Sequence, residues 1–179
     1  EDGALVYAAA GTGDDFELLA IETATGEVRH REAGWHVLQT AIHGERIITT
    51  YMHELRAGTV GRPGFTVLGL PQENHIQRLT LSSDGTLLAL GVARQARIFD
   101  AITGKWTIDL GSHNAHITGL VFVDSDRRLV TSSDDGTVAL WNVASGQRLL
   151  DLYRGEENVS NLSLSPDRGT LAISLATAE

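Results

Sequence analysis

Apolar residues in this chain come in short runs that are separated by polar turn residues. The run Leu87-Leu88-Ala89-Leu90 directly follows one such turn, Ser82-Ser83-Asp84-Gly85, and Ser165-Pro166-Asp167 is another. In turns of this kind Asp bonds its own backbone and Gly adopts a positive φ. No window long enough to bury a helical stripe has apolar residues at helical spacing. The pattern therefore predicts short strands in antiparallel hairpins and essentially no helix.

A glycine turn recurs with a period near 40 residues. Its copies are Ala24-Thr25-Gly26-Glu27, Ile102-Thr103-Gly104-Lys105, Ala144-Ser145-Gly146-Gln147 and the weaker Gly61-Arg62-Pro63-Gly64. The final glycines of these copies lie 38, 40 and 42 residues apart. Six residues after the last three of them stand Leu70, Leu110 and Leu152. A period that holds four short strands predicts the blades of a β-propeller.

The repeat divides residues 1–179 into blades of a single propeller segment. Whole blades are expected at 35–70, 75–110 and 117–152, and partial blades at 4–32 and 159–176. These make about seventeen strands, a little over four blades, whereas propellers have roughly 4–8 blades. The count predicts an incomplete ring or part of a larger propeller, completed by further residues, by a second chain or by a second copy. One misassigned strand would instead allow closure with four blades.

The segment from Leu110 to Leu152 carries the most specific motifs. They are Gly111-Ser112-His113, Ile117-Thr118-Gly119-Leu120-Val121-Phe122 and the run from Leu129 to Asn142. On these motifs the segment resembles the WD-repeat (β-transducin-like) propeller family. Blades of that family contain a hydrogen-bonded structural tetrad of His, Ser or Thr, Asp and Trp. The resemblance places this tetrad at His113, Thr131, Asp135 and Trp141. The other copies of the repeat keep only parts of the pattern.

The same resemblance implies where partners bind. Members of the family commonly bind proteins through residues beside the tetrad His and just before the tetrad Asp. Mapped onto the copies in this chain, these positions are His36, Leu38 and Met52; His75, Gln77 and Val92; and His116, Thr118 and Asp134. The resemblance therefore implies a non-catalytic interaction scaffold or sensor module within a larger protein or complex. The alternative is a propeller that binds a small ligand, or carries out hydrolytic chemistry, in its central channel.

Composition narrows the choice of partner. The chain has 14 Lys and Arg against 23 Asp and Glu, a net charge of −9, which argues against nucleic acid as the main partner. It has no Cys, which removes disulfides, thiol catalysis and Cys-based zinc sites. No apolar run approaches the length of a transmembrane helix, so membrane insertion is not expected. The absence of Cys is compatible with oxidising and reducing compartments alike. Of the possible locations, the cytoplasm is slightly favoured.

The pattern of reactive side chains does not predict catalysis. The seven His residues include no pair spaced to place two imidazoles on one helical face. His113 and His116 share a loop but lack an obvious third ligand. There is no nucleophile elbow, and the acidic residues lie at turn positions. We expect no catalytic residue, no metal and no cofactor.

Overall fold

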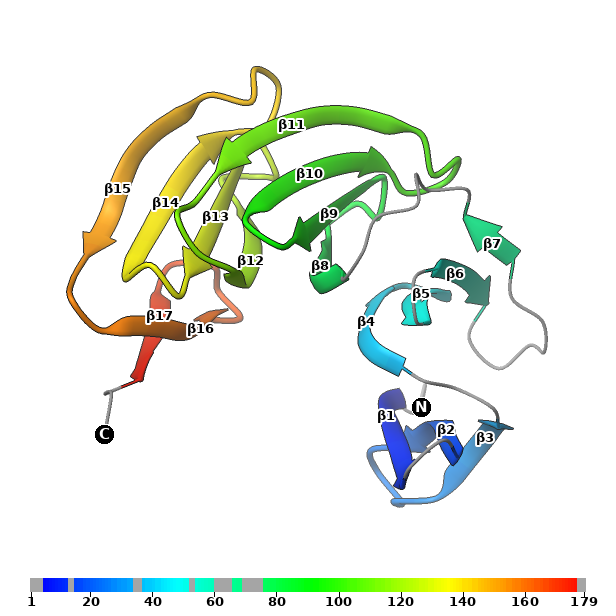
Figure 1. The fold of residues 1–179 in the computed structure, drawn as a ribbon. Coiled ribbons are helices and arrows are strands. Elements are labelled where there is room, and N and C mark those ends of the chain that lie inside the picture. Colours follow the sequence, from blue (N-terminus) through cyan, green and yellow to red (C-terminus); the bar gives the residue numbers. More distant parts are fainter. Residues whose placement is uncertain are drawn as a thin grey trace. The chain divides into compact units, whose positions relative to one another are not determined.

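A computed structural model describes residues 5–12, 15–33, 37–51, 54–59, 66–68 and 76–176. Every regular element within these residues is a β-strand, and they contain no helix. The strands form antiparallel sheets in which neighbours in sequence pair with one another (Figure 1). The predicted all-β fold of four-stranded antiparallel blades is confirmed. The chain divides into two compact units, residues 1–68 and 69–179, which we describe separately.

The first unit contains a three-stranded and a four-stranded sheet. The three-stranded sheet consists of β1 (Leu5–Thr12), β2 (Asp15–Glu22) and β3 (Val28–Ala33). The four-stranded sheet consists of β4 (Val37–His43), β5 (Arg46–Tyr51), β6 (Glu54–Thr59) and β7 (Thr66–Leu68). Ile48 and Leu55 are fully buried in this second sheet. The buried hydroxyl of Thr50 accepts a 3.0 Å hydrogen bond from the backbone N–H of Gln39, so its polarity is satisfied inside the sheet.

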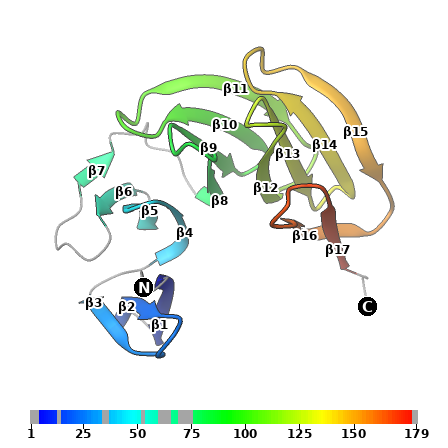
Figure 2. The ribbon, with the colours of Figure 1, turned by 180° about the vertical axis from the view of Figure 1, so that it is seen from behind.

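The second unit contains two four-stranded sheets and a two-stranded sheet. The first is β8 (Ile76–Leu81), β9 (Leu87–Val92), β10 (Gln95–Asp100) and β11 (Trp106–Ser112). The next is β12 (Ile117–Val123), β13 (Arg128–Ser133), β14 (Thr137–Asn142) and β15 (Arg148–Arg154), followed by β16 (Asn158–Leu164) and β17 (Leu171–Ala176). Strand β12 contacts β8 on one side and β16 on the other, so the three sheets follow one another in chain order (Figures 1 and 2).

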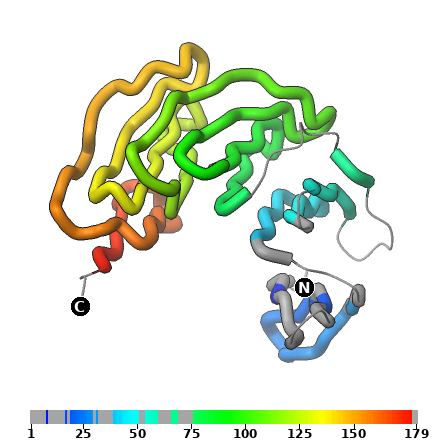
Figure 3. The backbone as a smooth tube through the Cα atoms, in the orientation of Figure 1, coloured from blue at the N-terminus to red at the C-terminus, as the bar shows by residue number. Residues whose placement is uncertain are grey.

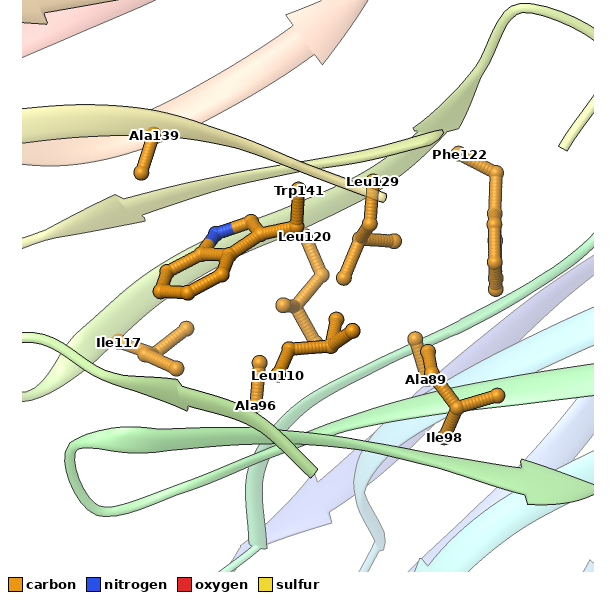
Figure 4. Packing of buried hydrophobic residues seen from close by; sticks show 10 residues of the cluster. All are labelled: Ala89, Ala96, Ile98, Leu110, Ile117, Leu120, Phe122, Leu129, Ala139 and Trp141. Atoms are coloured by element: carbon orange, nitrogen blue, oxygen red, sulfur yellow. The ribbon is translucent and has the colours of Figure 1, made fainter. Parts of the chain in front are cut away.

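Apolar cores fill the spaces between these sheets. The larger core combines Ile98 and Leu110 of one four-stranded sheet with Phe122, Leu129 and Trp141 of the next. Figure 4 shows the Trp141 ring within this cluster. A second core joins the middle sheet to the two-stranded sheet and contains Val130, Val138, Leu140, Val159 and Leu162. Burying each large apolar side chain contributes about 1.5–3 kcal/mol, so each sheet depends on its neighbours for stability.

The glycine repeat marks one kind of turn, which joins the last two strands of a sheet. The N–H groups of Gly26, Gly104 and Gly146 donate to the carbonyls four residues earlier over 2.8, 2.9 and 2.9 Å. The three glycines have φ angles of 73°, 70° and 72°. Figure 3 traces the backbone through these hairpins. Because the turns share one geometry, the sequence repeat corresponds to a structural repeat.

One carboxylate ties together turns from all three sheets of the second unit. Asp126, in the turn between β12 and β13, accepts a 2.8 Å hydrogen bond from the N–H of Ser83 in the first sheet. Its other oxygen accepts a 3.2 Å bond from Arg168 in the turn between β16 and β17. Asp124, Ser125 and Asp126 all have positive φ, at 52°, 51° and 64° respectively. The unusual backbone of this turn thus places the Asp126 carboxylate between Ser83 of the preceding sheet and Arg168 of the following sheet.

Candidate functional site

A buried polar network lies where the loop after β11 meets strands β13 and β14. His113 follows β11, Thr131 lies on β13, and Trp141 lies on β14. Asp135 is in the turn between β13 and β14, and Thr137 begins β14. The structure brings together the four residues of the expected tetrad and adds Thr137 to them.

The hydrogen bonds of the network form one continuous chain. The indole N–H of Trp141 donates to Thr131 Oγ1 over 2.8 Å, and Thr131 Oγ1 lies 2.6 Å from His113 Nε2. On the other side of the imidazole, Nδ1 lies 2.9 Å from Thr137 Oγ1. The Thr137 hydroxyl donates to Asp135 Oδ1 over 2.5 Å. Nδ1 also lies 3.4 Å from Asp135 Oδ2.

These contacts fix the tautomer of His113. Because the Thr137 hydroxyl gives its single proton to Asp135, it can only accept from the imidazole, so Nδ1 carries the proton. Nε2 is then the acceptor for the Thr131 hydroxyl, which itself accepts from Trp141. All donors in the chain therefore point from the indole toward the Asp135 carboxylate, an arrangement in which neighbouring bonds reinforce one another.

Thr137 is a member of the network that sequence reasoning missed. Its backbone N–H donates to Asp135 Oδ1 over 3.0 Å, in addition to the bond from its hydroxyl. The turn beginning at Ser82 repeats the arrangement, because Asp84 Oδ1 accepts from both the N–H and the hydroxyl of Thr86. The Asp-Gly-Thr spacing common to both turns is the signal that would have identified Thr137.

Burial and charge set the protonation states of the network. Burial lowers the pKa of His113 below its usual value, and the nearby charge of Asp135 opposes this only in part. Burial alone would raise the pKa of Asp135, but hydrogen bonds from Thr137 and from the N–H of Asn114, with His113 nearby, give a net lowering. The network therefore contains a neutral imidazole and an ionised carboxylate near pH 7.

Internal hydrogen bonds occupy the polar side chains of the network. Both imidazole nitrogens of His113 are hydrogen-bonded, and its side chain is 1% exposed. The guanidinium of Arg148 lies over the Trp141 ring, 5.3 Å from its centre.

In the part of the chain that the structure describes, no three His, Asp or Glu side chains gather as a metal site. The described residues also contain no helix that is long and apolar enough to cross a membrane.

Two of the expected partner-binding residues lie side by side near this network. The N–H of Asp134 donates to the carbonyl of His116 over 3.0 Å, which joins the turn before β14 to the loop before β12. His116 is exposed and Asp134 is partly exposed. Neither side chain has a hydrogen bond or ion pair to another described residue. The pair thus presents an imidazole and a carboxylate to solvent.

Other expected partner-binding residues face inward. Thr118 is buried, and its hydroxyl donates to the carbonyl of Val159 over 2.5 Å. Val92 is buried as well. Gln77 is partly buried, and its Oε1 has no hydrogen-bond partner among the described residues.

The remaining expected partner-binding positions are ones whose side chains the structure does not describe. His36, Met52 and His75 fall outside the described residues. Leu38 lies on β4, and its side chain is not among those described.

Comparison with known proteins identifies the repeat. The family model for the WD domain, G-beta repeat, matches residues 104–142, which contain all five residues of the network. The "Target of rapamycin complex subunit LST8" of Saccharomyces cerevisiae is 28% identical over 101 residues, covering 55% of this chain and 33% of that protein. The "Guanine nucleotide-binding protein subunit beta-5b" of Danio rerio is 41% identical over 54 residues, covering 30% and 14%.

A third relative is the human "WD repeat and SOCS box-containing protein 1", which is 31% identical over 97 residues, covering 52% of this chain and 23% of that protein. The chain thus spans a third or less of the length of these three relatives. Residues 104–142 match the WD-repeat model, and the resemblance to the WD-repeat family is confirmed.

Proposed function

We propose that this chain is a non-catalytic scaffold for protein partners, and that one partner binds at the loop pair of His116 and Asp134. The observation that carries the proposal is the pairing of these residues, held together by a backbone hydrogen bond while both side chains remain free. A partner can therefore meet a carboxylate and an imidazole from two loops that are joined to each other.

Two further observations support this role. The polar groups of the tetrad beside the pair are hydrogen-bonded to one another. The tetrad therefore positions the loops, and the exposed residues of these loops contact the partner. Two of the relatives carry the word "subunit" in their names, as expected for proteins that act in complexes.

The test compares two double variants in affinity capture with quantitative mass spectrometry. His116→Ala with Asp134→Ala removes the proposed contact, whereas Asp124→Ala with Arg127→Ala removes two charged side chains at the far end of β12. The two positions are roughly 20 Å apart for a strand of this length. We expect a discrete partner that is lost with the first variant and kept with the second. Equal capture by both variants would refute the assignment of this site.

A further inference from the structure

A pocket of about 490 Å³ opens between the two four-stranded sheets of the second unit. Strands β9, β10 and β11 of one sheet contribute part of its lining, and the β12–β13 turn, the end of β14 and the turn after it contribute the rest. These turns lie at the opposite end of the sheet from the loops that carry His116 and Asp134. A volume between about 300 and 1,000 Å³ is typical of sites for small molecules.

The pocket lies at the margin of the larger apolar core. Its lining includes buried Ile98 together with Leu87, Ile108 and Val143, which pack against that core but are only partly buried. Ala144, in the turn after β14, is exposed and also lines the pocket. A ligand that covers these side chains removes apolar surface from water, which favours binding. The body of such a ligand must therefore be apolar.

The backbone of the turn after β14 is already hydrogen-bonded. The N–H of Val143 donates to the carbonyl of Arg127 over 3.0 Å. Asn142 Oδ1 accepts from the N–H groups of Ala144 and Ser145 over 3.0 and 2.9 Å. The N–H groups of Val143 and Ala144 are therefore not available to a ligand.

Asp126 is the acidic residue in the pocket lining, and both of its oxygens are occupied. Oδ2 accepts from the N–H and the hydroxyl of Ser83, and Oδ1 accepts from Arg168 over 3.2 Å. A cationic ligand has to compete with Arg168 for this carboxylate. The pocket is therefore poorly suited to an amine.

The cationic and amide side chains of the lining retain unused donors. Arg127 donates from Nε and Nη2 to Asp124 over 3.2 and 2.6 Å, whereas its Nη1 has no partner among the described residues. The amide nitrogen of Asn142 likewise has no partner among them. A guanidinium binds a carboxylate more strongly than a neutral acceptor, because the hydrogen bond is charge-assisted. The polar end of the ligand should therefore be a carboxylate.

We propose that this pocket binds a small carboxylic acid with an apolar alkyl or aryl body. The body packs on Leu87, Ile108 and Val143, and the carboxylate accepts from Arg127 and from the Asn142 amide. The ligand contacts both sheets, so its binding stabilises the boundary between them. The pocket is separate from the proposed partner-binding loop pair, so each proposal can fail without the other.

The experiment titrates 4-phenylbutanoate into the full chain of 179 residues, labelled with ¹³C at the isoleucine methyl groups. The NMR shifts of the Ile98 and Ile108 methyls report on the pocket, and Ile173, which packs on the second core, is the internal reference. The matched probe is 4-phenylbutylamine, which has the same apolar body but a cationic end. For a probe of this size we expect a Kd on the order of 1 mM.

Two pairs of variants test the two ends of the bound molecule. Ala144→Phe adds a ring at the pocket, and the control Ser145→Phe adds the same ring at the next residue, which does not line it. Arg127→Gln removes the proposed anchor of the carboxylate. Its control, Arg128→Gln, removes the neighbouring arginine, which pairs with the same Asp124.

We expect saturable shifts of Ile98 and Ile108 with 4-phenylbutanoate, and affinity at least tenfold weaker with the amine. Ala144→Phe and Arg127→Gln should each weaken binding at least fivefold, and their controls less than twofold. The proposal is overturned if the shifts do not saturate by about 10 mM, if the amine binds equally well, or if Ile173 shifts as much as Ile108. It is also overturned if the variants match their controls. Should Ala144→Phe disturb the methyl spectrum of the free chain, the arginine pair decides the outcome.

Discussion

The rings of His113 and Trp141 meet edge to face, with centroids 6.1 Å apart and planes at 69°, and the hydroxyl of Thr131 joins them. One oxygen thus satisfies two buried ring nitrogens that have no other described partner on that side. This makes Thr131 the position at which the loop between β11 and β12 is attached to strands β13 and β14.

Replacing Thr131 by Val should destabilise the second unit by about 1–3 kcal/mol. The change keeps the shape but leaves His113 Nε2 and the Trp141 N–H buried without a partner, and an unsatisfied buried group costs about that much. Urea unfolding followed by tryptophan fluorescence measures the loss. Thr107→Val, at an exposed position, is the control, and a similar result for both variants would show that the network contributes little.

Stability should fall as the pH drops below the unfolded-state pKa of His113. Burial lowers the pKa of this imidazole in the folded protein, so the unfolded chain binds a proton that the folded chain does not. The contribution is fully present above about pH 6.5, the ordinary His value, and is lost as the pH falls toward the folded pKa. Asp135 opposes this shift and Arg148 adds to it.

Urea unfolding at a series of pH values, compared between the wild type and His113→Asn, measures this contribution. The variant removes the titrating group and should flatten the curve below about pH 6.5. A slope that is equally steep in both proteins would mean that other groups cause it. NMR titration of the His113 ring gives its folded pKa directly and should place it below the ordinary value.

Gly146→Ala should be far more damaging than Gly26→Ala. The two glycines occupy the same turn with φ of 72° and 73°, so both substitutions carry the same backbone strain, about 1–2 kcal/mol. A Cβ at Gly146 would also lie 2.4 Å from the carbonyl oxygen of Asp109, whereas a Cβ at Gly26 meets nothing within 4 Å. Hydrogen exchange resolved by peptide reports each unit separately. If both substitutions destabilise their units equally, the backbone around Asp109 on β11 moves aside at little cost.

Asp126→Asn should loosen the hairpin of β16 and β17. The substitution keeps a side chain that tolerates positive φ but removes the charge that faces Arg168. We expect faster exchange in residues 158–176, several-fold, with little change in the core of β12–β14. Asp124, in the same turn, pairs only with exposed arginines. The control Asp124→Asn should therefore leave the exchange rates of residues 158–176 unchanged. If both variants behave alike, the tie between turns is not formed through Asp126.

Local turn chemistry explains how much of this structure could be predicted. The glycine turns and the Ser-Asp-Gly turn depend on a few adjacent residues, so their strands followed from the sequence. The tetrad followed from the resemblance of one repeat to the WD-repeat family. The inward position of Thr118 could not be predicted, because it depends on the carbonyl of Val159, 41 residues away in the next sheet. Asp126 was missed for the same reason, since its partners belong to two other sheets.

The close fit of glycines between sheets has an evolutionary consequence. Gly146 sits against the carbonyl of Asp109 in the sheet before it, and a Cβ on Gly119 would lie 2.6 Å from Leu162 in the sheet after it. The sheet of β12–β15 is therefore fitted closely to the sheets on both sides of it. A gene rearrangement that moved one repeat alone would bring mismatched surfaces together, whereas duplication of adjacent repeats would preserve at least one fitted boundary. We therefore expect substitutions to be tolerated less at the boundaries between sheets than in the exposed loops.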